Sequence, residues 1–186
     1  PIKSSAASDV YKRQFLGCEG LTKVVLPESI EEVGDYLFAY CINLQEVELP
    51  TNMKYVGLYS FAGCKSLTNI NLENVEEIAD YAFTSSEILQ KVTLSNVVKI
   101  GFGSFASTSV SGNHQLDKLV SVGDYAFQNT YLTTFNAPNL EKIGIAAFEN
   151  NQLLTSFVFG SNLKEVGKKA FDGCVNLVNY YYDNPT

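Results

Sequence analysis

One phenylalanine returns at a nearly constant interval along almost the whole chain. Successive spacings are 23, 23, 22, 22, 22, 21 and 23 residues over eight positions, namely Phe15, Phe38, Phe61, Phe83, Phe105, Phe127, Phe148 and Phe171. A period of about 20 to 50 residues is typical of solenoids and other stacked arrays. Because a unit of this size cannot bury its apolar side chains alone, the units are expected to stack on one another.

Other columns keep the same register around the phenylalanine. A glycine stands four residues before it in six units, Ala79 replaces it in a seventh, and Val or Ile comes one position earlier. The alternation in Val47–Leu49 predicts a short strand with one buried face. The segment Ile30–Gly34 predicts a second extended piece that a glycine turn closes.

The run Gly-Asp-Tyr-x-Phe that follows this glycine indicates one turn of α- or 3₁₀-helix. Three acids, Asp35, Asp80 and Asp124, stand where a capping side chain would accept a backbone N–H at the start of that turn. Each unit is therefore expected to contain two strand segments and one helical turn.

The pattern L-x-x-V-x-L-P-x-x-I-x-x-V-G-x-x-A-F-x-x-C, nearly complete in residues 21–41 and again in 44–64, resembles the BspA-type leucine-rich repeat of bacterial surface proteins. The resemblance implies a right-handed, curved solenoid of seven to eight repeats of 21–23 residues, spanning 15–182, with a parallel sheet on its concave side. The repeat is weakest at Val110–Leu116, where Ser111 and His114 fall in apolar columns, so we expect a loop or bulge there.

Both ends of the chain differ from the repeat. Residues 1–14 are mostly polar and fit none of the columns, so we interpret them as a non-native or disordered segment. Residues 183–186 are interpreted as a truncated tail, because solenoids normally carry capping elements and none is visible here. The sequence thus predicts a fragment of a longer protein.

Composition excludes several classes of function. The chain has 13 Lys and Arg against 20 Asp and Glu, and a net charge of −7 argues against a nucleic-acid binder. No run approaches the roughly 18 apolar residues of a membrane span, so no direct membrane span is expected in this segment. One histidine and no tryptophan leave few groups for catalysis, and no enzyme activity is predicted.

The four cysteines, Cys18, Cys41, Cys64 and Cys174, share the column three residues after the phenylalanine with Ser86, Thr108, Thr130 and Asn151. A column that accepts Cys, Ser, Thr and Asn requires a small group that can form a hydrogen bond. A 23-residue spacing is also unlike that of zinc ligands. We predict buried free thiols and no metal site, with an occasional disulfide between neighbours left open.

Two local patterns imitate functional motifs. Residues 101–106 match the dinucleotide fingerprint G-x-G-x-x-G/A, but a 22-residue unit cannot contain the βαβ unit that this motif needs, so no cofactor is predicted. His114 lies three residues from both Ser111 and Asp117, but no oxyanion hole is evident. We interpret this segment as a polar irregularity, and His114 stays a weak binding candidate.

A column of tyrosines stands two residues before the phenylalanine and admits two interpretations. Its rings either cover an edge of the solenoid or stack on sugars or bases, the first being favoured. The column consists of Tyr36, Tyr59, Tyr81 and Tyr125.

The outward residues of the V-x-L strands are the predicted partner-binding face. They are mostly short, neutral and polar, which suits adaptable hydrogen bonding; the candidates are Lys23, Glu46, Glu48, Asn69, Asn71, Lys91, Thr93, Thr134 and Asn136. We expect non-catalytic binding of a protein or glycan by a monomer, and the family resemblance implies an extracellular or cell-surface location and adhesion. The alternative is a structural spacer that displays another domain.

Overall fold

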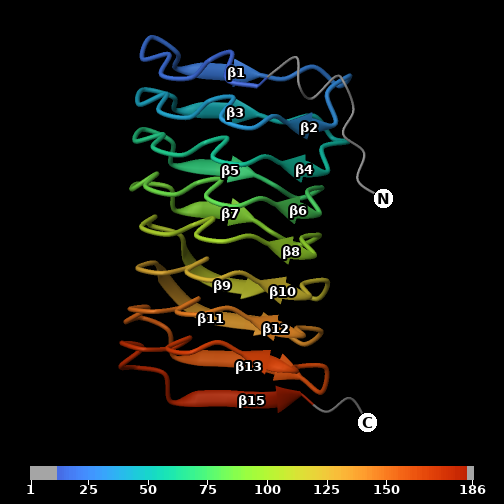
Figure 1. Cartoon of the computed structure of the whole chain (residues 1–186), viewed down its shortest axis with the longest axis vertical. Helices are drawn as coiled ribbons and strands as arrows, with labels where there is room; N and C mark the ends of the chain where they lie inside the picture. The colour runs from blue at the N-terminus through green and yellow to red at the C-terminus, as the bar shows by residue number, and fades with distance from the viewer. Residues whose placement is uncertain (1–11, 184–186) are drawn as a thin grey trace.

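The computed structural model describes residues 12–183, which form a stack of short parallel strands with two strands in most units (Figure 1). The odd-numbered strands derive from the V-x-L segments and are β1 (Lys23–Val25), β3 (Glu46–Glu48), β5 (Asn69–Asn71), β7 (Lys91–Thr93), β9 (Ser111–Gln115), β11 (Tyr131–Ala137), β13 (Ser156–Gly160) and β15 (Asn179–Asp183). The even-numbered strands have two residues each and are β2 (Glu32–Val33), β4 (Tyr55–Val56), β6 (Glu77–Ile78), β8 (Lys99–Ile100), β10 (Ser121–Val122), β12 (Lys142–Ile143) and β14 (Glu165–Val166). The predicted solenoid of stacked repeats is confirmed.

The two sides of the stack differ in continuity. The even-numbered strands form one seven-stranded parallel sheet from β2 to β14. The odd-numbered strands form three groups, β1–β3, β5–β7 and β9–β11–β13–β15. The odd-strand face is therefore interrupted between β3 and β5 and again between β7 and β9.

The phenylalanine column is the centre of the core. From Phe38 to Phe148 each of its side chains is fully buried. Neighbouring rings lie 5.1 to 5.5 Å apart, with planes inclined by 20° or less. This offset stacking lets one aromatic template fill the core of successive units.

The prediction of a helical turn after the column glycine is wrong, because residues 12–183 contain neither α- nor 3₁₀-helix. Instead, the amides of Tyr36, Phe38 and Tyr40 donate to carbonyl oxygens of the next unit at 2.7 to 2.9 Å, while Leu37 and the other intervening residues close turns within their own unit. The cause is the left-handed backbone at Tyr36 (φ 58°) and Tyr40 (φ 60°), which aims alternate amides across the stack. A helix would aim all of them along its own axis.

The glycine column itself is required by close approach of neighbouring units. A Cβ atom at Gly57 would lie 2.5 Å from the carbonyl oxygen of Val33 in the preceding unit. Any side chain there would force the two backbones apart, so the glycine sets the spacing of the stack.

The three column acids also act between units, not as caps of their own turn. The carboxylate of Asp80 accepts the amide of Phe102 at 2.7 Å, and Asp35 and Asp124 do the same for the next unit at 3.0 and 2.7 Å. Along the stack the column alternates between acidic and apolar residues, in the order Asp35, Leu58, Asp80, Phe102, Asp124 and Ile145. The alternation keeps like charges from facing each other in adjacent units.

Candidate functional site

The nine predicted partner-binding residues lie together on the odd-strand face. In β3 and β5 the outer residues of each strand are exposed while the central Val47 and Ile70 are buried. Parallel pairing places Lys23 beside Glu46 and Asn69 beside Lys91. Thr134 and Asn136 on β11 are half-buried. The alternation therefore separates the residues that build the core from those that form the surface.

At the β1–β3 end of this face the charges neutralise one another. The ammonium group of Lys23 lies 2.9 Å from a carboxylate oxygen of Glu46 and 2.6 Å from one of Glu48. The hydrogen bond that Lys23 donates to Glu48, followed by the one it donates to Glu46, raises the pKa of Lys23 to about 12. The same contact with Lys23 lowers the pKa of Glu48. This cluster offers few unused charges to a ligand.

Lys91, on β7, is different. Among residues 12–183 it has no carboxylate within ion-pair distance, whereas both lysines on the even-numbered strands, Lys99 and Lys142, have one. Its neighbours on β5 are the amides of Asn69 and Asn71, so this part of the face carries an unpaired cation among neutral groups.

A groove opens beside Lys91, where the odd-strand face is interrupted between β7 and β9. Its volume is about 350 Å³, and its polar lining consists of Lys91, Thr93, Ser95, Ser111, Asn113, His114 and Gln115. Asn113 and Gln115 are face residues that the sequence analysis missed. The sequence does indicate them, because His114 stands in an apolar column and the residues on either side of it should therefore point outward.

The weak repeat contains a strand as well as the expected irregularity. Ser111–Gln115 forms β9, and its pairing with β11 shifts register between Leu132 and Thr134. His114 pairs with Phe135 and replaces an apolar residue. Its Nε2 lies 3.2 Å from the carbonyl oxygen of Ser111, and burial lowers its pKa. The half-buried imidazole therefore favours its neutral form.

A Ser-His-Asp relay does not form in this segment. His114 contacts the main-chain oxygen of Ser111, not its hydroxyl. The carboxylate of Asp117 accepts a hydrogen bond from Nε2 of Gln115 at 2.5 Å. The three residues are close in sequence, but their side chains are engaged elsewhere.

The sequence matches the BspA-type leucine-rich repeat region in six copies, over residues 8–130 and 120–185. The chain belongs to this family. Leucine-rich repeat families of this kind are generally non-enzymatic. No curated protein sequence matches the chain.

Two solved structures resemble this BspA-type chain in fold. A leucine-rich repeat protein from T. pallidum has a TM-score of 0.60 and 22% identity, over 89% of this chain and 69% of that one. A leucine-rich cell surface protein from Faecalibacterium prausnitzii A2-165 has a TM-score of 0.59 and 19% identity, over 92% of this chain and 62% of that one. At these identities the likeness concerns the fold alone.

The cysteine column of the BspA-type repeat has the hydrogen-bonding role predicted from its composition. The thiols of Cys41, Cys64 and Cys174 each donate to the carbonyl oxygen of the anchor phenylalanine one unit earlier, at 3.0 to 3.3 Å. Ser86 makes the same bond at 2.8 Å. All four cysteines are free, and residues 12–183 hold no cluster of three or more His, Cys, Asp or Glu side chains suited to a metal.

The tyrosine column of the repeat is a continuous stack, which favours the edge-covering interpretation. Ring centroids are 5.0 Å apart between Tyr36 and Tyr59 and 4.6 Å apart between Tyr59 and Tyr81. The guanidinium of Arg13 lies 4.9 Å above the ring of Tyr36. Because each of these ring faces is covered by a neighbour, a sugar or base has no free face to stack on within this part of the column.

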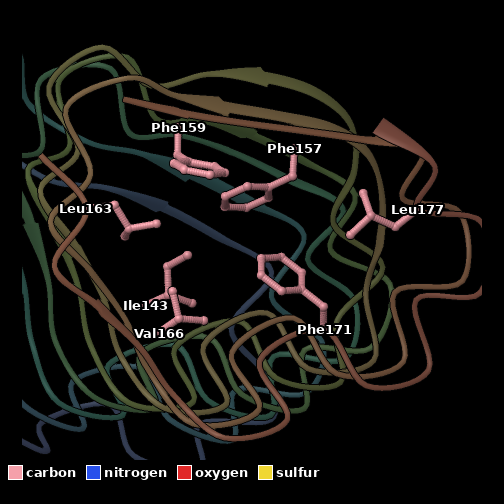
Figure 2. Close-up of a pocket in the computed structure, with 7 residues that line it drawn as sticks. All are labelled: Ile143, Phe157, Phe159, Leu163, Val166, Phe171 and Leu177. Carbon is pink, nitrogen blue, oxygen red and sulfur yellow. The ribbon is translucent and has the colours of Figure 1, made fainter. Parts of the chain in front are cut away.

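A second cavity, of about 200 Å³, lies in the last described units and is lined only by apolar side chains (Figure 2). The side chains that surround it belong to Ile143, Phe157, Phe159, Leu163, Val166, Phe171 and Leu177. It is the end of the core, where Val166 on β14 is 52% exposed. With no polar group in its lining, this cavity offers no hydrogen bonds to select a polar ligand.

In the part of the chain that the structure describes, no helix is long and apolar enough to span a bilayer.

Proposed function

We propose that this chain is a non-catalytic recognition module of a bacterial cell-surface or secreted leucine-rich repeat protein, and that it binds a protein or glycan through the odd-strand face. The observation that carries the proposal is the alternation along β3, β5 and β7. The outer residues are exposed while the central ones pack in the core. Such a surface can change its ligand without a change of fold.

The composition of the odd-strand face supports recognition. Asn69, Asn71 and Thr93 have short side chains that lose little conformational entropy when they form hydrogen bonds. The strands that carry them pack on a buried core, which lowers the ordering cost of binding. An adhesion role agrees with the family to which the chain belongs.

The even-numbered sheet provides a contrast within the same molecule. On these strands and directly before them, ion pairs link successive units, such as Lys54 with Glu76 at 2.7 Å, Lys99 with Glu77 at 2.6 Å and Lys142 with Glu165 at 2.9 Å. Exposed pairs of this kind contribute little to stability and keep the surface soluble. Their charges are already matched within the protein, so we assign this side no partner.

The experiment is an array of immobilised glycans and extracellular-matrix proteins. Wild type is compared with a face variant in which Glu46, Asn69, Asn71 and Lys91 are changed to Ala, and with a control in which Lys54, Lys99 and Lys142 are changed to Ala. The proposal predicts at least a tenfold loss of binding in the face variant alone, about 1.4 kcal/mol or more, with a nearly unchanged Tm. Equal binding by both variants, or no binding by wild type as a spacer would show, contradicts it.

A further inference from the structure

The groove between β7 and β9 is a notch in the surface, not a gap through the solenoid. The two units remain stacked in the core, where the rings of Phe83 and Phe105 are 5.1 Å apart. On the even-numbered side β8 pairs with both β6 and β10. Separation is thus confined to the odd-strand face.

The notch is also closed at one end. The amide of Ser111 at the start of β9 still donates to the carbonyl oxygen of Gln90, just before β7, at 3.2 Å. A peptide that added itself as a strand would need a free edge along several residues. The short, closed notch does not offer one, and its volume of about 350 Å³ is instead at the lower end of small-molecule sites.

The polar groups in the notch are preorganised. The side-chain oxygen of Asn113 accepts hydrogen bonds from the hydroxyls of Thr133 and Thr134 at 2.8 and 2.9 Å. This fixes the amide and leaves its nitrogen to donate to a ligand. Gln115 is held in the same way through its nitrogen by Asp117, which leaves its oxygen to accept. One donor and one acceptor therefore stand in set positions on β9.

The cation stands on the opposite wall. Lys91 has no ion-pair partner among residues 12–183 and lines the notch together with the hydroxyls of Thr93 and Ser95. A single ammonium beside several hydroxyls and amides matches a ligand that combines one carboxylate with several hydroxyl groups.

We propose that the notch binds an acidic sugar, a carboxylate-bearing residue of the uronic- or sialic-acid type within a glycan. Lys91 receives the carboxylate, and Thr93, Asn113 and Gln115 receive the hydroxyls. This inference rests on the proposed function and names the ligand class for one part of the odd-strand face.

The test is a titration of the full chain with trigalacturonate and, as the neutral counterpart, with maltotriose, followed by calorimetry and by amide chemical shifts. We expect trigalacturonate to bind at least tenfold more tightly than maltotriose, with shifts concentrated in residues 91–95 and 111–115. Lys91→Gln should lose about tenfold in affinity, and about 0.5 M NaCl should weaken the wild type because it screens the ion pair. Lys54→Gln, on the other side of the solenoid, is the matched control and should bind as wild type does.

Three results would overturn the inference. They are equal binding of the acidic and the neutral sugar, undiminished binding by Lys91→Gln, and Lys91-dependent binding of a hexaglutamate peptide as tight as that of trigalacturonate. The last result would assign the notch to acidic peptides. If the face variant loses array binding but the notch binds no sugar, this inference alone is contradicted. If the face variant binds the array as well as wild type does, the proposed function is contradicted too.

Discussion

The ring of Phe102 lies 4.9 Å from that of Tyr81, although Phe102 stands one position earlier in its repeat than the tyrosine does. On its other side it lies 5.3 Å from Tyr125. The tyrosine position of this unit is occupied by Gly103, whose φ of 55° matches the left-handed backbone of the column. Phe102 thus supplies the ring that Gly103 lacks, and the aromatic stack stays unbroken.

This compensation predicts strong coupling between residues 102 and 103. Phe102→Ala should destabilise by about 1 to 3 kcal/mol because it opens a gap. Gly103→Tyr should destabilise because its Cβ would lie 3.0 Å from the Tyr81 ring and a second ring would compete with Phe102. The double variant should be destabilised by at least about 1 kcal/mol less than the sum of the losses in the two single variants, as measured by urea unfolding. Simple additivity would contradict the compensation.

The buried anchor column gives a second prediction. Phe83 is fully buried between Phe61 and Phe105, so Phe83→Ala should reduce the free energy of unfolding by about 3 to 5 kcal/mol. Phe15→Ala is the matched control, because Phe15 belongs to the same column but is 39% exposed, and its cost should be clearly smaller. If the two changes proved equally mild in chemical denaturation, the register of the column would be wrong.

The cysteines should differ sharply in reactivity. Burial raises the pKa of Cys64 to about 12 and also raises the pKa of Cys41 and of Cys174, so little of the reactive thiolate exists near pH 8. Cys18 is half-buried and should be modified first by a disulfide reagent. We expect one fast thiol in the native protein, lost in Cys18→Ser, with the others reacting only as the protein unfolds. Fast modification of Cys64 would contradict its placement in the core.

His114 should make stability depend on pH in the mildly acidic range. Burial lowers its pKa in the folded state, while in the unfolded chain the pKa is about 6.5. Below about pH 6.5 the unfolded chain therefore binds more protons than the folded one. The free energy of unfolding accordingly decreases as the pH is lowered, until the folded-state pKa is passed. The free energies of unfolding of wild type and His114→Val are compared by urea unfolding from pH 7.5 to 5. On acidification the wild type should lose stability relative to the variant. A constant difference would contradict the burial of the ring.

The sequence was sufficient for the parts of the fold that each unit repeats. The sequence alone predicted the anchor phenylalanines, the column glycine and the column of Cys, Ser, Thr and Asn. Each of these columns recurs in several repeats, so a substitution in one repeat does not hide the pattern. The nine face residues, such as Asn69 and Lys91, followed from the period of two within each strand. The structure places them on one face.

What the sequence concealed depends on contacts between units. Asp80 satisfies the amide of Phe102 in the next unit, and the residue type alone does not distinguish this from a local cap. The left-handed tyrosines replaced the expected helical turn, since a β-like ladder between units uses the same residues as a capped turn. The notch beside Lys91 arises because β7 pairs with β5 alone and β9 with β11 alone, a break that composition does not encode.

The expected non-native or disordered segment, residues 1–14, lies mostly outside the described residues. Of the expected tail, 183–186, Asp183 is the last residue of β15, and residues 184–186 lie outside the described residues. Within the described part, the amide of Arg13 donates to the carbonyl oxygen of Asp35 at 3.2 Å. The backbone of Arg13 is left-handed, with a φ of 60°, as in the tyrosine column that it precedes.

The central claim, recognition through the odd-strand face, is tested most directly by a hydrogen-exchange footprint of the tightest-binding member of the array on the intact chain. The account predicts slower amide exchange in residues 46–48, 69–71, 91–93 and 111–115, and unchanged exchange in the two-residue strands of the even-numbered sheet. Protection confined to that sheet or to the tyrosine stack, with none along β3, β5, β7 and β9, would contradict it.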